Sequence, residues 1–315
     1  KLEDAVYFSP KYSNYISNSR LGLLKNKGEE AFIQGSFQDG FNPSFRLGSL
    51  VHELTLQPDL FELAPDLSKP SAKLGAMADE LYNSFINSEH VSDEDIYKAS
   101  DVVNYYKGKM NEDKCEFVRG TCMKYWRNRR DYEEKYSTTK TIEYTDTKSM
   151  ELVMGCANSL HNNNTVQELL HPKDSFGNDI ISENEQAILL DINVDIDNQR
   201  SNIIHLKAKI DNYTIDKESN TITINDVKTT SQDTRCFADS VENFSYYREL
   251  SWYAMLLSIY ARHYYNMPNP IIKGNFLVVS TKEPYYSLVY SMTTDLFKKG
   301  IEEYKHLLKQ GSIML

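Results

Sequence analysis

The sequence predicts a mixed α/β (α+β) domain, with a central mixed β-sheet flanked by helices and a helical insertion. Two observations predict this fold class. Apolar residues recur at helical spacing within residues 11–63 and again near the end of the chain, whereas apolar and polar residues alternate between residues 187 and 230. Runs of both kinds in one chain are typical of α+β or mixed α/β domains.

The first two helices are expected within residues 11–36 and 42–63. Ser17 or Ser19 can cap the first helix. Its apolar face consists of Leu21, Leu23 and Leu24. The apolar positions of the second helix follow an i, i+3, i+4, i+7 pattern and are Leu47, Leu50, Val51 and Leu54. That helix should end before Pro58, because proline disfavours a helical conformation in the residue before it.

Residues 71–170 are predicted to be mostly helical. After them the spacing of apolar residues changes from helical to alternating. Three alternating segments form a predicted β-meander at 187–196, 203–216 and 221–230. The remaining elements are an aromatic-rich helix at 246–265, strands at 273–280 and 285–292, and a closing helix from 293. Thr293 or Thr294 should cap this last helix, and Gly311 should end it.

The length of 315 residues suits one large domain or two small ones. We expect a single domain over 1–315, with a helical insertion at about 68–170 and a core at about 42–63 and 180–310. Hydrophobic residues make up 40% of the chain and charged residues 25%, an ordinary balance for a soluble globular protein. No apolar run is long enough to span a bilayer, and the N-terminal segment KLEDAVYFSP lacks the layout of a signal peptide.

Charge and cysteine content bear on the partners and the compartment. The formal net charge of −10 counts against nucleic-acid binding, which usually requires a basic surface. Binding depends on local patches, however, and a metal site itself concentrates acids. The cysteines are Cys115, Cys122, Cys156 and Cys236. Without a C-x-x-C spacing they indicate free thiols in a reducing compartment, hence a cytoplasmic protein without a zinc or iron–sulfur site.

Asp226 and Lys228 flank Val227 in the predicted strand TITINDVKTT, so both side chains point to one face of a sheet. One interpretation is an exposed ion pair on a strand edge. The other is half of a metal site, because a hairpin brings Asp211 near Asp226 and two close carboxylates repel unless a cation neutralises them. Such ligands suit Mg²⁺, and the Val227 carbonyl is a further candidate. Lys228 would then orient or activate water, or stabilise charge on phosphate, during metal-assisted phosphodiester hydrolysis.

His52, Glu249 and Tyr253 complete the candidate site. An isolated histidine on a helix is commonly a half-buried surface residue, but neutral imidazole is also a frequent metal ligand, so His52 has two interpretations. Glu249 and Tyr253 stand at i and i+4 on the aromatic-rich helix and therefore share a face. That face is either part of the site or a helix surface beside a buried tyrosine.

Taken in order, these pieces resemble the PD-(D/E)XK nuclease superfamily, most closely the exonuclease VIII (RecE-type) recombination exonucleases of phages and prophages. The matching segments are YISNSRLGLL, RLGSLVHELTLQPDLF, LKAKID, NDVKTT, ELSWY, NFLVVSTKEPYYSLVY and GIEEYKHLL. The resemblance covers about 11–67 and 180–310, and the middle of the chain matches only loosely. It implies a restriction-endonuclease-like core.

The resemblance also implies roles for individual residues. The implied metal ligands are His52, Asp211 and Asp226. Lys228 would be the catalytic lysine, and Tyr253 would help position the DNA strand or the site. One departure is Glu249, where the family has glutamine, because an ionised glutamate cannot donate a hydrogen bond to phosphate. The other is Lys209, where the family often has arginine and its bidentate grip.

Two further features are ambiguous from sequence. Glu183 or Glu185 can supply another acid at the start of the first long strand, but a solvated strand start is the favoured interpretation of both. Residues 123–135 interleave basic and aromatic side chains, as in grooves that follow a nucleic-acid strand. A mixed-charge helix with a buried tryptophan is the favoured interpretation, and Lys207, Lys209 and Lys282 are better placed for DNA contact.

We therefore expect a Mg²⁺-dependent deoxyribonuclease, with Mn²⁺ as an alternative ion, that degrades linear double-stranded DNA in phage-type recombination. The resemblance implies a single-strand annealing protein as partner and allows a ring-shaped homo-oligomer, in a bacterial or phage-infected cytoplasm. One alternative is a protein of the same fold that binds nucleic acid or a protein without cleaving. Another is an endonuclease or single-strand nuclease, because one fold supports many specificities.

Overall fold

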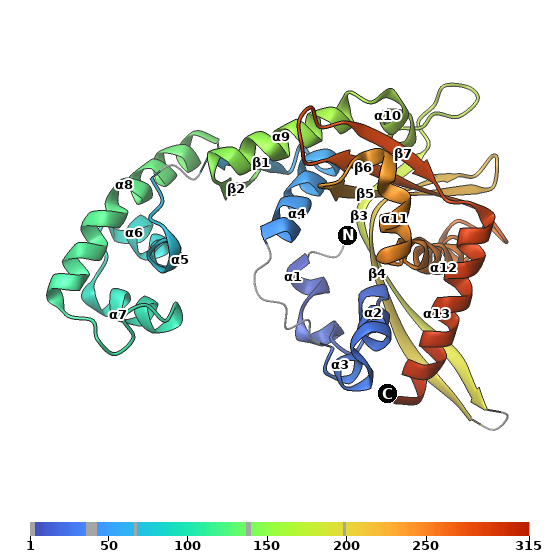
Figure 1. Ribbon diagram of the computed structural model, residues 1–315, viewed down its shortest axis with the longest axis horizontal. Helices are drawn as coiled ribbons and strands as arrows, with labels where there is room; N and C mark the ends of the chain where they lie inside the picture. The colour runs from blue at the N-terminus through green and yellow to red at the C-terminus, as the bar shows by residue number, and fades with distance from the viewer. Residues whose placement is uncertain (1–3, 36–42, 66–67, 137–139, 198–199, 315) are drawn as a thin grey trace. The chain divides into compact units, whose positions relative to one another are not determined.

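The computed structural model describes residues 4–35, 43–65, 68–136, 140–197 and 200–314. The chain divides into two compact units, a larger one formed by residues 1–57 and 152–315 and a smaller one formed by residues 58–151 (Figure 1). The expectation of a single domain over 1–315 stays a prediction. Each unit is described below by itself.

The larger unit contains a five-stranded sheet. Its strands are β3 (Ile181–Asp197), β4 (Arg200–Asp216), β5 (Thr221–Thr230), β6 (Ile271–Ser280) and β7 (Ser287–Ser291). They lie side by side in that order, and every neighbouring pair is antiparallel except β5 and β6, which are parallel. The mixed sheet and the predicted β-meander are confirmed.

Helices flank this sheet (Figure 1). They are α1 (Asp4–Tyr7), α2 (Asn18–Lys27), α3 (Glu29–Gln34), α4 (Pro43–Leu56), α9 (Thr147–His161, in this unit from Leu152), α10 (Asn164–Leu170), α11 (Phe237–Asn243), α12 (Tyr246–Tyr264) and α13 (Thr294–Met314). Single turns of 3-10 helix occur at Pro10–Tyr12 and Thr234–Cys236. The parallel strands β5 and β6 require a crossover connection, which α11 and α12 provide.

The core of the larger unit forms where α12 covers the sheet. Ile222 and Ile224 of β5 alternate with polar residues, so both point to the same face, and both are fully buried. Trp252 and Leu256 of α12 belong to the same buried cluster. Each aliphatic side chain buried in this way contributes about 1.5–3 kcal/mol relative to exposure. This packing fixes α12 over the middle of the sheet.

Helix α13 begins as predicted and ends differently. The Thr293 hydroxyl accepts a hydrogen bond from the Leu296 N–H at 3.3 Å, which confirms Thr293 as the cap. The prediction that Gly311 ends the helix is wrong, because α13 continues to Met314. A Cβ at Gly311 would lie 2.6 Å from Phe32 Cζ, so the glycine allows close packing on α3.

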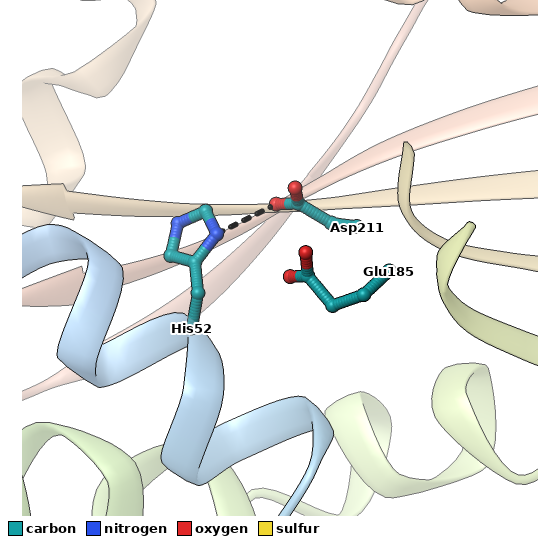
Figure 2. A group of neighbouring side chains, drawn as sticks. All are labelled: His52, Glu185 and Asp211. Carbon is teal, nitrogen blue, oxygen red and sulfur yellow. Dashed lines mark ion pairs between the residues drawn. The ribbon is translucent and has the colours of Figure 1, made fainter. Parts of the chain in front are cut away.

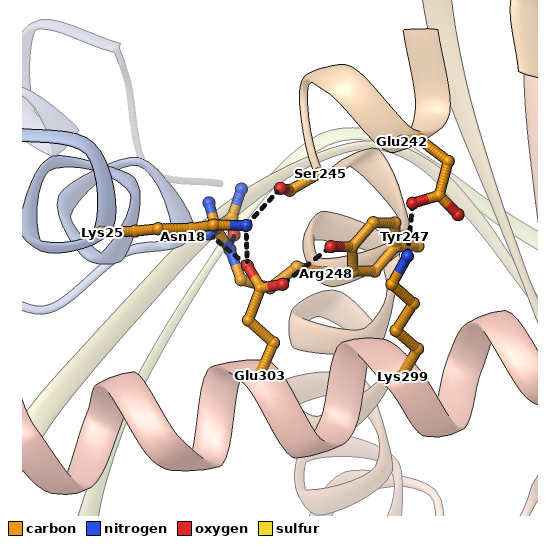
Figure 3. A network of polar contacts seen from close by, with 8 residues as sticks. All are labelled: Asn18, Lys25, Glu242, Ser245, Tyr247, Arg248, Lys299 and Glu303. Atoms are coloured by element: carbon orange, nitrogen blue, oxygen red, sulfur yellow. Dashed lines mark hydrogen bonds and ion pairs between the residues drawn. The ribbon is translucent and has the colours of Figure 1, made fainter. Parts of the chain in front are cut away.

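A polar network fastens α2 to α12 and α13 (Figure 3). Ser17 caps α2, as predicted, by accepting a hydrogen bond from the Arg20 N–H. The buried Arg248 of α12 donates to Asn18 of α2 at 2.8 Å and to Glu303 of α13 at 2.7 Å. Buried charges of this kind require partners, and here the partners of Arg248 come from two other helices, α2 and α13.

The smaller unit is mostly helical, in agreement with the prediction for residues 71–170. Its helices are α5 (Ala72–Glu80), α6 (Tyr82–Ser88), α7 (Asp93–Val102) and α8 (Glu112–Tyr136). Two short strands, β1 (Phe61–Pro65) and β2 (Thr141–Thr145), pair in parallel and were not predicted. The unit has its own core, in which Trp126, Met77 and Phe85 are buried.

In the described part of the chain, no helix combines the length and apolar character needed to cross a membrane. All four cysteines are free thiols, as predicted, and only Cys236 among them is exposed.

Candidate metal centre

The candidate site lies where β4 and β5 separate. Their antiparallel pairing runs from Asp216 and Thr221 to Asn212 and Asn225 and ends there. The next residue on each strand, toward the site, is Asp211 on β4 and Asp226 on β5. The Val227 N–H donates to Asp211 Oδ2 at 2.8 Å, so a carboxylate accepts the hydrogen bond of a strand amide. The predicted hairpin therefore brings these two acids onto adjacent strands.

Strand β3 brings a third acid, Glu185. The pairing of β3 with β4 includes Asn184 opposite Asn212 and Gln186 opposite Ile210, but not Glu185. Glu185 has φ of 52°, in the left-handed region that non-glycine residues rarely adopt. Such a conformation costs about 1–3 kcal/mol and tends to persist at functional sites.

His52 reaches the same point from α4. Its Nδ1 lies 3.2 Å from Asp211 Oδ2 (Figure 2). One ligand atom each from His52, Glu185 and Asp211 lie within 4.8 Å of one another, an arrangement that can hold a metal ion. The site thus combines one imidazole with two carboxylates, from a helix and two strands.

Asp226 lies outside that group and faces a second cluster. Its Oδ2 is 2.7 Å from Lys228 Nζ, and Lys228 Nζ is 3.1 Å from Glu249 Oε2 on α12. The Tyr253 hydroxyl donates to Glu249 Oε1 at 3.1 Å. The interpretation of Asp226 and Lys228 as an exposed pair on a strand edge is wrong, because β5 is an inner strand and the Asp226 side chain is only 2% exposed.

The ion pair between His52 and Asp211 changes the pKa of both side chains. Burial lowers the pKa of His52, but the charge of Asp211 and its hydrogen bond outweigh burial and raise that pKa to about 8. Burial raises the pKa of Asp211, but His52 outweighs it and leaves that pKa below its usual value. Burial and the charge of Asp211 raise the pKa of Glu185. The three side chains are therefore electrostatically linked.

The ionised form of Asp226 is disfavoured by its surroundings. Burial raises its pKa well above the usual value, and the charges of Glu249 and Asp211 add to this while Lys228 opposes it. Its Oδ1 is buried and has no hydrogen-bond partner among the described residues. A buried carboxylate oxygen without a partner is costly, so a cation beside Asp226 would satisfy it.

Negative charge exceeds positive charge around this point. The carboxylates are Glu185, Asp211, Asp226 and Glu249, and the cations are Lys209, Lys228 and His52, whose pKa of about 8 keeps it protonated near neutral pH without a metal. A surplus of carboxylates in a partly buried site is the environment that divalent cations neutralise. The residues present therefore fit a divalent metal ion, through Glu185, Asp211 and His52 with Asp226 nearby.

Glu185 is the site residue that sequence reasoning did not favour. The expectation of a solvated strand start is wrong for it, because its side chain is 11% exposed and lies 2.5 Å from Lys209 Nζ. Glu183 instead pairs with Tyr213 along β3 and β4 and is not among the clustered acids.

The basic and aromatic segment at 123–135 belongs to the smaller unit and has a structural role. Tyr125 and Trp126 are buried in its core. Arg129 lies 3.0 Å from Glu133 and stacks on the Tyr82 ring, so its charge is already matched. The favoured interpretation, a mixed-charge helix with a buried tryptophan, is confirmed.

A cavity of about 490 Å³ adjoins the site in the larger unit. Its lining includes Tyr7, Tyr15, Arg20, Lys207, Lys209 and Tyr253. Tyr253 and Lys209 contact the acids described above, so the cavity continues from them. Lys282, the third lysine expected near the site, is exposed and is not part of this lining.

No protein-family model matches this chain, and no curated protein matches it in sequence. Among solved structures, a chain from Eubacterium rectale that is provisionally described as an exonuclease has a TM-score of 0.49 with 8% sequence identity. The match covers 100% of this chain and 88% of the other. A likeness this distant carries no conclusion about activity, so the function is argued from the residues alone.

Proposed function

We propose that this protein is a divalent-metal-dependent nuclease of the PD-(D/E)XK type that hydrolyses phosphodiester bonds of DNA. The observation that supports it is the convergence of His52, Glu185 and Asp211 within 4.8 Å beside the buried Asp226 and Lys228. Acids from neighbouring strands can hold the ion that metal-assisted hydrolysis needs, and a lysine two residues after one of them can stabilise charge on phosphate.

The metal ligands would be His52, Glu185 and Asp211, with Asp226 and the Val227 carbonyl as further candidates. A bound Mg²⁺ or Mn²⁺ would polarise the phosphate and lower the pKa of water. Carboxylates suit both ions, and the imidazole makes Mn²⁺ a stronger competitor than an all-oxygen site would.

Lys228 would act as a cation rather than as a base. Burial lowers its pKa, but Asp226 and Glu249 outweigh burial and hold that pKa well above its usual value, so the ammonium keeps its proton near neutral pH. It would donate a hydrogen bond to a phosphate oxygen and stabilise the charge that develops there. During hydrolysis water attacks phosphorus and releases a proton to solvent, the bond to the leaving sugar oxygen breaks, and that oxygen takes up a proton from solvent.

Glu249 and Tyr253 would orient Lys228 and the incoming strand. The Tyr253 hydroxyl holds Glu249, which holds the ammonium at 3.1 Å. Tyr253 also lines the adjoining cavity, together with lysine and arginine side chains. A cavity of this size suits part of a DNA strand.

The finer proposal is a RecE-type exonuclease that degrades linear double-stranded DNA in phage-type recombination, in a cytoplasm. The sequence motifs support it, from LGSLVHELTLQPDLF to DVKTT. An annealing-protein partner and a ring-shaped oligomer follow from the same resemblance.

A test is degradation of linear double-stranded DNA labelled at one 5′ end, with Mg²⁺, with Mn²⁺ and with EDTA. Asp226→Ala should abolish metal-dependent cleavage, whereas Asp239→Ala, which changes an exposed aspartate of α11, should leave it unchanged. Release of mononucleotides supports an exonuclease, and cutting of closed circles an endonuclease.

A folded protein that cleaves nothing with either ion would overturn the nuclease proposal. The alternative is then a protein that binds nucleic acid without cleaving it. One observation favours this alternative, because Lys228 already contacts two carboxylates and therefore has less of its charge available for phosphate. A retention assay on immobilised DNA would detect that function.

A further inference from the structure

Five polar side chains, one from each strand, form a continuous ladder across the sheet. Its members are Asn184, Asn212, Asn225, Asn275 and Ser291. Each stands directly opposite the next in the strand register. The amides of Asn212, Asn225 and Asn275 and the hydroxyl of Ser291 each donate to the side-chain oxygen of the preceding member, at 2.7 Å, 2.7 Å, 3.0 Å and 2.8 Å in that order.

The three central members of the ladder are buried, so their hydrogen bonds matter for stability. Asn212 and Asn225 are 0% exposed and Asn275 is 6% exposed. Burying an amide costs free energy unless its hydrogen bonds are made, and a fully connected buried network specifies one arrangement of the groups in it. A row of asparagines in a β-sheet core therefore has a structural cost that an aliphatic row would avoid.

Its position along the chain relates it to the acids. Asn184 precedes Glu185, Asn212 follows Asp211, and Asn225 precedes Asp226. Consecutive residues of a strand point to opposite faces, so each asparagine is adjacent in sequence to an acid without occupying the acid's side of the strand.

The ladder is continuous where the main-chain pairing is interrupted. Glu185 and Asp211 do not pair across β3 and β4, and the pairing of β4 with β5 ends at Asn212 and Asn225. The side-chain bonds between Asn184, Asn212 and Asn225 therefore lie directly beside the break in the β3–β4 pairing and the end of the β4–β5 pairing, where they add lateral connections between the strands.

The ladder also reaches the helix that carries His52. The Asn184 amide donates to the Leu56 carbonyl at the end of α4 at 2.7 Å. Leu56 lies one helical turn beyond His52. The Asn225 amide donates to the Leu169 carbonyl of α10 at 3.0 Å. One network thus joins the strand neighbours of Glu185, Asp211 and Asp226 to the helix that carries His52.

We propose that Asn184, Asn212 and Asn225 are positioning residues that set the spacing of the metal ligands. The inference rests on the proposed metal centre. Groups behind the ligands commonly change metal affinity by about 10–100-fold when they are replaced. Asn275 and Ser291 continue the ladder away from the acids, where β5, β6 and β7 are fully paired, so they serve stability alone.

The test is a calorimetric titration of the full chain with Mn²⁺ alone, without nucleic acid, for wild type, Asn212→Leu and Asn275→Leu. The two substitutions are chemically identical and remove buried members of the same ladder. Asn212→Leu should raise the dissociation constant for Mn²⁺ by about tenfold or more. Asn275→Leu should lower the thermal midpoint of the metal-free protein about as much as Asn212→Leu does. Its dissociation constant for Mn²⁺ should stay within about twofold of the wild-type value.

Equal dissociation constants for the two variants would overturn the positioning role and leave the nuclease proposal standing. No Mn²⁺ binding by wild type would overturn the metal centre itself, and this inference with it. If Asn212→Leu does not fold, Asn184→Ala makes the same comparison from the half-buried end of the ladder. Its prediction is the same loss of affinity, and an unchanged affinity would again overturn the role.

Discussion

At the scale of single residues, the main feature is a lysine between two acids. Lys228 is 2.7 Å from Asp226 and 3.1 Å from Glu249. Glu249 also raises the pKa of Asp226 by repulsion, after the larger effect of burial. Glu249 therefore stabilises the ammonium and destabilises the neighbouring carboxylate, so its net contribution to a reaction is a balance of two effects.

Glu249→Gln should keep nuclease activity or increase it by up to about tenfold. The amide removes the repulsion on Asp226 and can donate to phosphate. Single-turnover cleavage rates over a range of Mg²⁺ concentrations would measure the effect.

Glu249→Ala is the matched variant, and it should lower the rate because the Tyr253 hydroxyl loses its acceptor. If Glu249→Gln is as inactive as Glu249→Ala, the carboxylate itself has a role in the reaction.

The sequence predicted which residues form most of the site, but not how the backbone positions all of them. Asp211, Asp226 and Lys228 follow from strand alternation and a hairpin, and the structure brings them together. Glu185 did not follow, because its inclusion depends on a left-handed backbone conformation that leaves no trace in residue pattern. The ladder of asparagines was missed because its partners are distant in sequence.

At the scale of elements, the contact of α13 with α12 depends on a glycine. A Cβ at Gly300 would lie 2.5 Å from the Tyr247 carbonyl oxygen and would also clash with Ser251 Oγ. Gly300→Ala should therefore destabilise the larger unit by about 1–3 kcal/mol, which urea unfolding would measure.

Gly120→Ala is the control for the same substitution. Gly120 is an exposed position of α8, and an added Cβ there meets nothing within 4 Å. This variant should stabilise its own unit by about 0.5–1 kcal/mol, the usual gain for alanine over glycine in a helix. A Gly300→Ala variant as stable as wild type would show that α13 can shift away from α12.

The network around Glu303 predicts how stability depends on pH. Burial raises the pKa of Glu303, but hydrogen bonds from Lys25 and Tyr247 and the charge of Arg248 outweigh it and lower that pKa (Figure 3). The folded state therefore binds this proton less readily than the unfolded state. The stabilisation is complete above the ordinary glutamate pKa of about 4.3 and is lost as pH falls through the lowered folded value.

Glu303→Gln should accordingly lower the free energy of unfolding by about 1–3 kcal/mol at pH 7 and by less at pH 3. Denaturant unfolding at both pH values would measure the difference. Glu302→Gln, an exposed position of the same helix with the same charge change, should have little effect at either pH. An equal loss for Glu303→Gln at both pH values would exclude the charge as its cause.

Element prediction succeeded where the periodicity was clear and missed the two short strands of the smaller unit. Strands β3 to β5 and helices α4, α12 and α13 contain enough residues for alternation or helical spacing to be unambiguous. Strands β1 and β2 have five residues each, and they pair with each other from distant parts of the sequence. Gly311 misled the prediction because close packing on Phe32, rather than a turn, explains it.

At the scale of the whole molecule, the two units have separate cores, and each core contains one tryptophan. Trp126 belongs to the smaller unit and Trp252 to the larger, and both are 0% exposed. The chain has only these two tryptophans. Each therefore reports the unfolding of its own unit.

We expect the units to unfold in two separate steps, because neither core contains residues of the other. Trp126→Phe and Trp252→Phe would each leave one reporter, and urea titrations of the two variants should give different midpoints. Adding Mn²⁺ should shift only the midpoint that Trp252 reports. Coincident transitions that shift together would instead support the single domain predicted over residues 1–315.

The division of the larger unit between the two ends of the chain affects how the protein is synthesised. Residues 58–151 form a unit with a local core, which can fold while the ribosome is still adding residues. His52 must wait for β4 and β5, which are translated after that unit is complete. A nascent or truncated chain that ends before β5 therefore lacks Asp226 and Lys228, so the proposed cleavage activity can arise only after β5 has been translated.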